Sequence, residues 1–297
     1  MPGSGDLRLA ARGQGVTILH ASDLHFGRPH RPAAAEALLR LARAVRPDAI
    51  VVSGDLTQRA KVREYRAARA FLARLEPTPV VVTAGNHDVP LYRAWERLLA
   101  PYRNYRTYIS PRLDTVLDIA GAGDPPGIRF VALNSSSPRR AIVNGRLTGR
   151  QLDFAAGAFA GIPGIWKRVL VVHHNLVDTG DDDPIPPLPR APRILQKAAE
   201  WRVDLILAGH IHRTRLAWSH DESARSPRRG VPVVVAGTAS STRGRGRETG
   251  RNSVNVLNVR RSGIEVAVYL YSERASRFQR HDSRDFPAQL YGVHDIK

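Results

Sequence analysis

Aspartate, histidine and asparagine side chains follow five separate apolar runs of this 297-residue sequence. Carboxylate, imidazole and amide groups bind harder or borderline metal ions, and the chain has no cysteine that could add a thiolate. One ion could not use all of these groups, whereas two ions that share a bridging carboxylate could. Two such ions, about 3.5–4 Å apart, can clamp a phosphoryl group and activate a water molecule. The candidate ligands are Asp23, His25, Asp55, Asn86, His87, His173, His174, His210 and His212.

Asp55 is the natural bridge between two ions. Its carboxylate has two oxygens, and it follows Gly54 in a tight turn after an apolar run. For any single histidine, the ordinary alternative is a buried structural side chain with a satisfied hydrogen bond. Polar groups at the ends of five apolar runs would be an unusual way to build a core, so the whole set indicates a metal centre.

The apolar runs before these residues are short and continuous, which is typical of strands buried on both faces. Between the first three runs, Ala33–Val45 and Lys61–Leu75 have helical spacing. This β-α-β-α-β order predicts an α/β sheet with right-handed crossovers, in which ligands gather at the carboxyl ends of the strands. The five predicted strands are Val16–His20, Ala49–Val52, Val80–Thr83, Val169–Val172 and Val203–Leu207.

Further strands and helices are predicted downstream, with no internal repeat and no linker. Leu91–Tyr108 and Arg193–Trp201 have helical patterns, and Thr148 should cap a helix that ends near Ala160. We therefore expect a single domain at 16–271, a flexible N-terminus at 1–15 and a C-terminal tail at 272–297. The additional predicted strands are Thr115–Ala120, Ile128–Asn134, Val231–Ala236, Ser253–Val259 and Ile264–Tyr271.

The formal net charge of +18 has two interpretations. It could indicate a nucleic-acid or anionic-membrane partner. It could also reflect a genome biased toward arginine codons, because lysine occurs at only four positions, and we favour this second interpretation. Under either interpretation, the positive field favours anionic substrates. The segment Thr242–Asn252 is rich in Arg and Gly, which fits either an anion-binding loop or a simple mobile turn.

No targeting or membrane segment is visible in the sequence. Residues 1–15 have no apolar core of the secretory type, and the longest apolar runs are far shorter than the ~20 residues of a membrane helix. A cytoplasmic protein is therefore expected. The acidic run Asp181–Asp183 is interpreted as a solvent-exposed turn rather than as a further metal site.

Five short motifs together resemble the signature of the calcineurin-like metallophosphoesterases. Their order, residue types and strand context all agree, and they extend from Asp23 to His212. The opening Ser22-Asp23-Leu24-His25-Phe26 is most similar to the class III cyclic nucleotide phosphodiesterase branch. The motifs are Asp23-x-His25, Gly54-Asp55, Gly85-Asn86-His87-Asp88, His173, and Gly209-His210-x-His212.

This resemblance implies a fold and a set of residue roles. The fold would be a four-layer αββα sandwich, in which two mixed β-sheets are flanked by helices. A water or hydroxide between two ions would attack phosphorus in line, and His87 would stabilise the transition state or protonate the leaving oxygen. Asp88 would orient His87, and His174 would lie beside the site as an outer-shell residue. The first ion would be held by Asp23, His25, Asp55 and His212, and the second by Asp55, Asn86, His173 and His210.

One departure from the family pattern concerns the substrate pocket. Many relatives have proline shortly after the histidine pair, where this chain has Asn175. The set of candidate metal ligands is unaffected. Substrate choice would depend on loops whose sequences do not indicate which substrate they bind. These loops are Gln58–Tyr65, Tyr102–Tyr108, Ser135–Arg146 and Asp178–Arg190.

The sequence therefore favours a phosphodiesterase that uses two divalent ions, Mn, Fe or Zn, on a small anionic phosphodiester such as a 3',5'-cyclic nucleotide. A hydrolase of pyrophosphates or nucleotide-lipids and a nuclease are alternatives within the same superfamily. A basic nucleic-acid-binding protein with little catalysis is an alternative of another class, suggested by the net charge and the arginines between Arg243 and Arg251.

Overall fold

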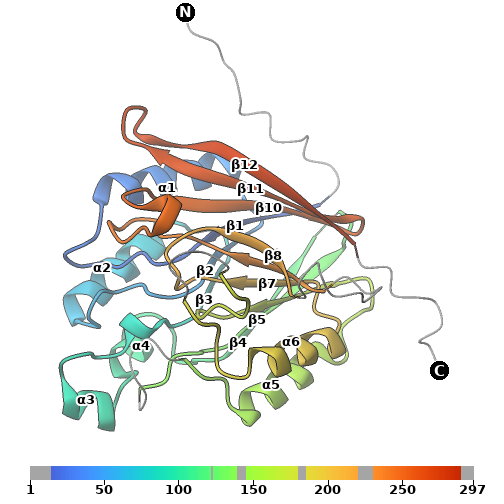
Figure 1. Ribbon diagram of the computed structural model, residues 1–297, viewed down its shortest axis with the longest axis horizontal. Helices are drawn as coiled ribbons and strands as arrows, with labels where there is room; N and C mark the ends of the chain where they lie inside the picture. Colours follow the sequence, from blue (N-terminus) through green and yellow to red (C-terminus); the bar gives the residue numbers. More distant parts are fainter. Residues whose placement is uncertain (1–14, 122, 139–144, 180–184, 220–229, 289–297) are drawn as a thin grey trace, which may run out of the picture.

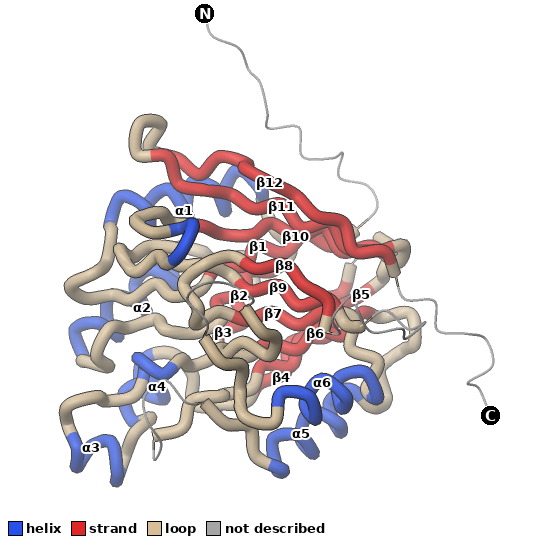
Figure 2. The backbone as a smooth tube through the Cα atoms, in the orientation of Figure 1, coloured by secondary structure: helices blue, strands red, loops and turns tan. Residues whose placement is uncertain are grey.

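The computed structural model describes residues 15–121, 123–138, 145–179, 185–219 and 230–288. Most of the expected flexible N-terminus, as well as Asp181–Asp183, lies outside these residues. Two six-stranded mixed sheets form the centre of the molecule (Figure 2). The first has the order β12-β11-β10-β1-β2-β3, and the second has the order β4-β5-β6-β7-β9-β8.

The strands of the first sheet are β1 (Val16–Ala21), β2 (Ala49–Val52), β3 (Val80–Val82), β10 (Ser253–Arg260), β11 (Gly263–Ser272) and β12 (Arg277–Pro287). Those of the second are β4 (Thr115–Ala120), β5 (Gly127–Ala132), β6 (Lys167–Val171), β7 (Leu205–Ala208), β8 (Arg215–Trp218) and β9 (Pro232–Val235). The helices are α1 (Pro32–Val45), α2 (Val62–Ala73), α3 (Ala94–Leu99), α4 (Arg103–Tyr108), α5 (Gly149–Phe159) and α6 (Ala191–Glu200). Figure 1 shows their arrangement.

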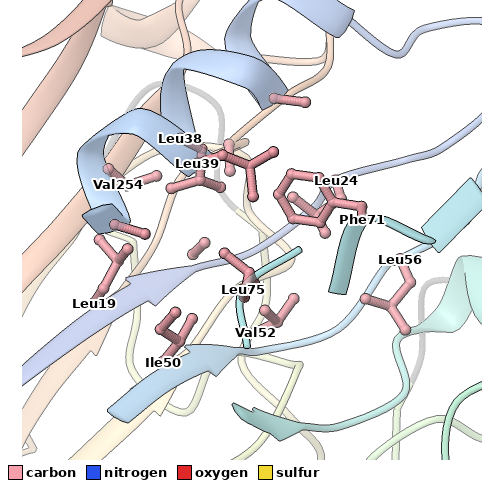
Figure 3. Packing of buried hydrophobic residues seen from close by; sticks show 14 of the residues in the cluster. Leu19, Leu24, Leu38, Leu39, Ile50, Val52, Leu56, Phe71, Leu75 and Val254 are labelled. Carbon is pink, nitrogen blue, oxygen red and sulfur yellow. The ribbon is translucent and has the colours of Figure 1, made fainter. Parts of the chain in front are cut away.

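Successive side chains of the central strands point to opposite faces and enter different cores. In β1, Ile18 packs between the two sheets, whereas Leu19 packs toward α1 and α2. In β2, Val51 faces the other sheet, and Ile50 and Val52 face the helices (Figure 3). The strands are continuously apolar because both of their faces are buried. The second sheet repeats this arrangement with α5 and α6, so the expected αββα sandwich is confirmed.

Several local expectations are wrong. Residues expected to form a C-terminal tail include β12, which pairs antiparallel with β11, so the sheet continues well beyond the expected boundary at 271. Leu91–Tyr108 forms two short helices, α3 and α4, rather than one long helix. Strand β8 was not expected. The predicted helix cap is confirmed, because Thr148 accepts a hydrogen bond from the backbone N–H of Gln151.

Candidate metal centre

The loops that follow β1, β2, β3, β6 and β7 meet at one edge of the sandwich. Backbone bonds fix this meeting: the N–H of Asp23 donates to Gly54 O at 3.0 Å, and the N–H of His25 donates to Asp55 O at 2.9 Å. The second sheet is attached by the N–H of His210, which donates to Asp23 Oδ2 at 3.0 Å. The parallel strands thus deliver their polar residues to a common edge, as expected for their carboxyl ends.

Asp23, His25, Asp55 and His212 form a first group of buried side chains. One candidate ligand atom from each lies within 4.8 Å of all the others. His212 Nε2 lies 3.0 Å from Asp23 Oδ1 and 3.3 Å from His25 Nε2. This convergence of two carboxylates and two imidazoles has the composition of a transition-metal or zinc site.

Asn86, His173 and His210 form a second group against the same aspartate, Asp55. The Oδ1 atom of Asn86 lies 3.1 Å from His173 Nε2 and 3.0 Å from His210 Nδ1. Asp55 Oδ2 lies 3.4 Å from His173 Nε2 and 3.6 Å from His25 Nε2. One carboxylate oxygen therefore stands where the two groups meet, which is the position that a bridging ligand requires.

Two buried carboxylate oxygens without hydrogen-bond donors indicate that both ligand groups could bind cations. Asp23 Oδ1 and Asp55 Oδ2 are buried and accept no hydrogen bond from the described parts of the chain. An unpaired buried carboxylate oxygen is strongly unfavourable. A metal ion at each group would satisfy these oxygens, so the residues present fit a pair of metal ions.

Backbone carbonyls set the orientation of two of the histidines. His173 Nδ1 donates to Ser53 O at 2.8 Å, and His212 Nδ1 donates to Arg243 O at 3.0 Å. With the proton held at Nδ1, the lone pair of Nε2 faces the ligand group in each ring. Both imidazoles are thereby prepared for metal coordination.

Burial favours the neutral form of two candidate histidine ligands, and the buried carboxylates draw positive charge to the site. Burial lowers the pKa of His25 to about 4 and that of His210 to about 3. Burial opposes the ionisation of Asp55, but the neighbouring His173 and His87 hold the pKa of that carboxyl below its usual range. Burial likewise disfavours the charged form of His173, yet Asp55 raises its pKa to about 9. The two carboxylates thus attract positive charge, which bound cations would supply.

Five of the site residues adopt the left-handed backbone conformation, which is unfavourable for residues other than glycine. Such conformations persist where the surrounding structure fixes them, and they cluster at functional sites. Here, they turn each loop sharply so that its side chain points to the shared edge. The values of φ are 55° for Asp23, 47° for His25, 51° for Asp55, 75° for His210 and 57° for His212.

Gly85 lies so close to Asp55 that a side chain there should disrupt the site. A Cβ atom at Gly85 would stand 2.1 Å from Asp55 Oδ1 and 2.3 Å from its backbone N. We expect Gly85→Ala to lower bound metal severely and to cost about 1–3 kcal/mol of unfolding free energy. Metal analysis and chemical denaturation would measure both effects. Gly149→Ala is the matched control, since nothing lies within 4 Å of its Cβ position; equal metal loss in both variants would contradict the prediction.

His87 lies beside the first group and remains half-buried. Its Nδ1 donates to Gln58 O at 2.9 Å, and its ring meets the ring of His25 edge-on with centroids 4.9 Å apart. Its Nε2 is therefore the atom left for a substrate. His174 also lies beside the site: its Nδ1 is 2.8 Å from Ser135 Oγ, and its ring centroid is 4.5 Å from that of His210.

Asp88 holds the loops together rather than the ring of His87. Its carboxylate accepts hydrogen bonds from the backbone N–H groups of Leu56, Thr57 and Gly85 and from the hydroxyl of Thr57. The expected direct orientation of His87 by Asp88 is not observed, because the carbonyl of Gln58 holds that ring. Asp88 instead joins the loop after β2 to the loop after β3.

Asp88→Ala is expected to destabilise the protein strongly. It would leave several buried donors without an acceptor, at about 1–3 kcal/mol for each unsatisfied group, so a loss of about 3 kcal/mol or more is expected. Urea denaturation of the metal-free protein would measure it. Asp118→Ala is the control, because Asp118 forms a partly exposed ion pair with Arg129 and should cost less than about 1 kcal/mol. Equal losses would contradict the assignment.

The structure brings together every candidate ligand proposed from the sequence. The sequence did not identify Ser53, Gln58, Ser135 and Arg243 as individual site residues. Three of these act at the site through a backbone carbonyl, which has no side-chain signature in a sequence. Gln58 and Ser135 do fall in loops that were expected to line the pocket.

Residues 16–214 match the calcineurin-like phosphoesterase family, and this range contains all of the candidate ligands. The chain belongs to that family. This metallophosphoesterase is 25% identical over 266 residues to a protein named "Probable cyclic nucleotide phosphodiesterase" of Rhodococcus erythropolis, covering 81% of this chain and 80% of that protein. It is 29% identical over 267 residues to the cAMP/cGMP dual specificity phosphodiesterase of Mycobacterium tuberculosis, covering 80% and 75% respectively.

Among solved structures, the purple acid phosphatase PPD1 of yellow lupin seeds is similar to this metallophosphoesterase, with a TM-score of 0.68. The sequences are 13% identical, and the likeness covers 94% of this chain and 55% of that chain, so it supports the fold alone. Within the described residues, no helix is both long and apolar enough to cross a membrane.

Proposed function

We propose that this metallophosphoesterase is a two-metal phosphodiesterase that hydrolyses a small phosphodiester such as a 3',5'-cyclic nucleotide. The observation that carries the proposal is the position of Asp55 Oδ2, within 3.6 Å of imidazole nitrogens from both ligand groups. Asp23, His25, Asp55 and His212 would hold the first ion. Asp55, Asn86, His173 and His210 would hold the second.

The donor set of the two groups favours Mn, Fe or Zn, because it combines imidazole with carboxylate and amide oxygen and contains no thiolate. When bound, two such ions supply an activated water and neutralise charge on the phosphoryl oxygens. The chain itself supplies the proton transfer. His87 is held through Nδ1 by the carbonyl of Gln58, so its Nε2 can protonate the leaving oxygen or stabilise the charge on it.

The preference for diesters is supported by the names of the two relatives, which are cyclic nucleotide phosphodiesterases at 25% and 29% identity. The types of candidate ligand alone do not separate diesters from monoesters or pyrophosphates. The substrate must therefore be tested directly, and the cytoplasmic location likewise stays a prediction.

The deciding experiment is hydrolysis of bis(p-nitrophenyl) phosphate beside p-nitrophenyl phosphate by protein loaded with Mn, Fe or Zn, followed by 3',5'-cAMP. We expect faster cleavage of the diester, dependence on added metal and loss of activity with a chelator. Cleavage of the monoester alone would contradict the phosphodiesterase assignment, and cleavage of a nucleotide pyrophosphate alone would favour the pyrophosphate hydrolases.

Nucleic-acid binding is a second candidate function. It is favoured by the net charge of +18 and by a cavity of about 480 Å³ with several arginines in its wall, among them Arg247 and Arg251. It predicts affinity for DNA or RNA that falls steeply as salt rises. Absent or salt-insensitive binding, together with metal-dependent hydrolysis of small diesters, would exclude it.

A further inference from the structure

Arg243 is fixed to the candidate metal centre through its backbone. Its carbonyl accepts the hydrogen bond from His212 Nδ1 at 3.0 Å. Its neighbours are held in turn, because the N–H of Thr242 donates to Pro29 O at 2.8 Å and the N–H of Arg245 donates to His212 O at 3.1 Å. The position of this arginine therefore follows from the same loop contacts that orient a candidate ligand.

The side chain of Arg243 spans the rim of the site. Its Nη1 lies 3.5 Å from Gln58 Oε1, and the carbonyl of Gln58 accepts the hydrogen bond from His87 Nδ1. The ring of His25 contacts the rings of both neighbouring histidines, with its centroid 5.1 Å from that of His212 and 4.9 Å from that of His87. Arg243 thus contacts the residue that holds His87 through its side chain and the candidate ligand His212 through its backbone.

This guanidinium has little to bind within the protein. Its Nε is buried, and the described part of the chain offers that nitrogen no hydrogen-bond partner. Among the described residues, its Nη1 contacts the neutral amide of Gln58, at the limit of hydrogen-bond length. By contrast, Arg74 and Arg129 have close carboxylate partners. A half-buried guanidinium with donors that the protein does not use is able to bind an anion that reaches it.

We propose that Arg243 is a substrate-binding residue that donates hydrogen bonds to the non-bridging oxygens of the phosphoryl group. A planar guanidinium matches a phosphoryl group with two parallel donors, which an ammonium cannot reproduce. The inference rests on the proposed function, since it places the reacting phosphoryl group at the same ligand groups. It adds a specificity element, because Arg243 would favour substrates that keep a negative charge on phosphorus.

The test measures binding of inorganic orthophosphate to the Mn-loaded full chain by calorimetry, beside metal content by elemental analysis. We expect Arg243→Ala to keep its metal, since the bond to His212 comes from the backbone, and to weaken orthophosphate binding about 10- to 100-fold. Arg243→Lys should recover only part of this loss. Arg274→Ala is the control: it removes the same charge at an exposed position between β11 and β12 and should change binding less than about twofold.

Unchanged orthophosphate binding in Arg243→Ala would overturn the inference, as would an equal loss in Arg274→Ala. A loss of metal from Arg243→Ala in proportion to its loss of orthophosphate binding would also overturn it, since the effect would then come from the ligand groups and not from the guanidinium. Orthophosphate binding needs no turnover. A wild-type protein that binds orthophosphate through Arg243 but cleaves no ester would contradict the proposed function and leave this inference intact.

Discussion

Asp55→Asn is expected to remove metal and hydrolysis together. The backbone N–H of His87 donates to Asp55 Oδ1 at 2.8 Å, so an asparagine would keep its carbonyl oxygen there. Its NH₂ group would then take the place of Oδ2, which faces His25 and His173. A donor at that point cannot bridge two cations. We expect metal content to fall by at least one ion per chain and hydrolysis to fall by about 1,000-fold or more.

Elemental analysis and diester hydrolysis on the same preparation would check this result. Asp118→Asn is the control, because it removes one carboxylate from a surface ion pair with Arg129 and should leave both measurements unchanged. Full metal content and full hydrolysis in Asp55→Asn would show that Asp55 is not a bridging ligand. Full metal content with lost hydrolysis would show that Asp55 takes part in the reaction without being needed to hold the metal.

His87→Ala is expected to give the second large effect, with the metal retained. Its ring is held by Gln58, and it contacts His25 only by its edge, so both ligand groups should survive its loss. Loss of a general acid typically costs about 10²–10⁴ in rate. The loss of rate should be smaller for p-nitrophenolate, which leaves without a proton, than for the alkoxide leaving group of a cyclic nucleotide.

Rates for the two kinds of leaving group, measured on wild type and His87→Ala with equal metal loading, would check this. A rate loss of the same size for both leaving groups would contradict proton donation and favour simple charge stabilisation by His87. A loss of metal in His87→Ala would show that His87 is a metal ligand or that it holds a ligand in place.

The sequence was sufficient to predict the centre of the fold and the site, for a physical reason. Strands such as Ala49–Val52 are buried on both faces and are therefore continuously apolar, so their ends are easy to locate. Polar residues directly after such strands can only lie at the carboxyl edge. The candidate ligands Asp23, Asp55 and His173 were located in this way without any view of their contacts.

The features that were missed have weak or absent sequence patterns. The sequence of β12 has the pattern of a polar tail, because nearly all of its side chains face solvent. Its buried aromatic side chains are Phe278 and Phe286. The side chain of Asp88 was expected to orient His87, whereas its partners are the hydroxyl of Thr57 and three backbone N–H groups, which any residue could supply. Contacts made by a backbone carbonyl, such as that of Arg243 to His212, have no residue type to recognise.

The position of β10 between β1 and β11 has a consequence for biosynthesis. Strand β1 pairs with β2 soon after it emerges, but its other edge is completed only by β10, which follows all six strands of the second sheet. At 20 residues per second, that edge waits ~10 s or longer for its partner. An apolar strand with an open edge is a template for pairing with other chains. The nascent protein should therefore be prone to aggregation until its last strands are made, and its refolding yield should fall as protein concentration rises.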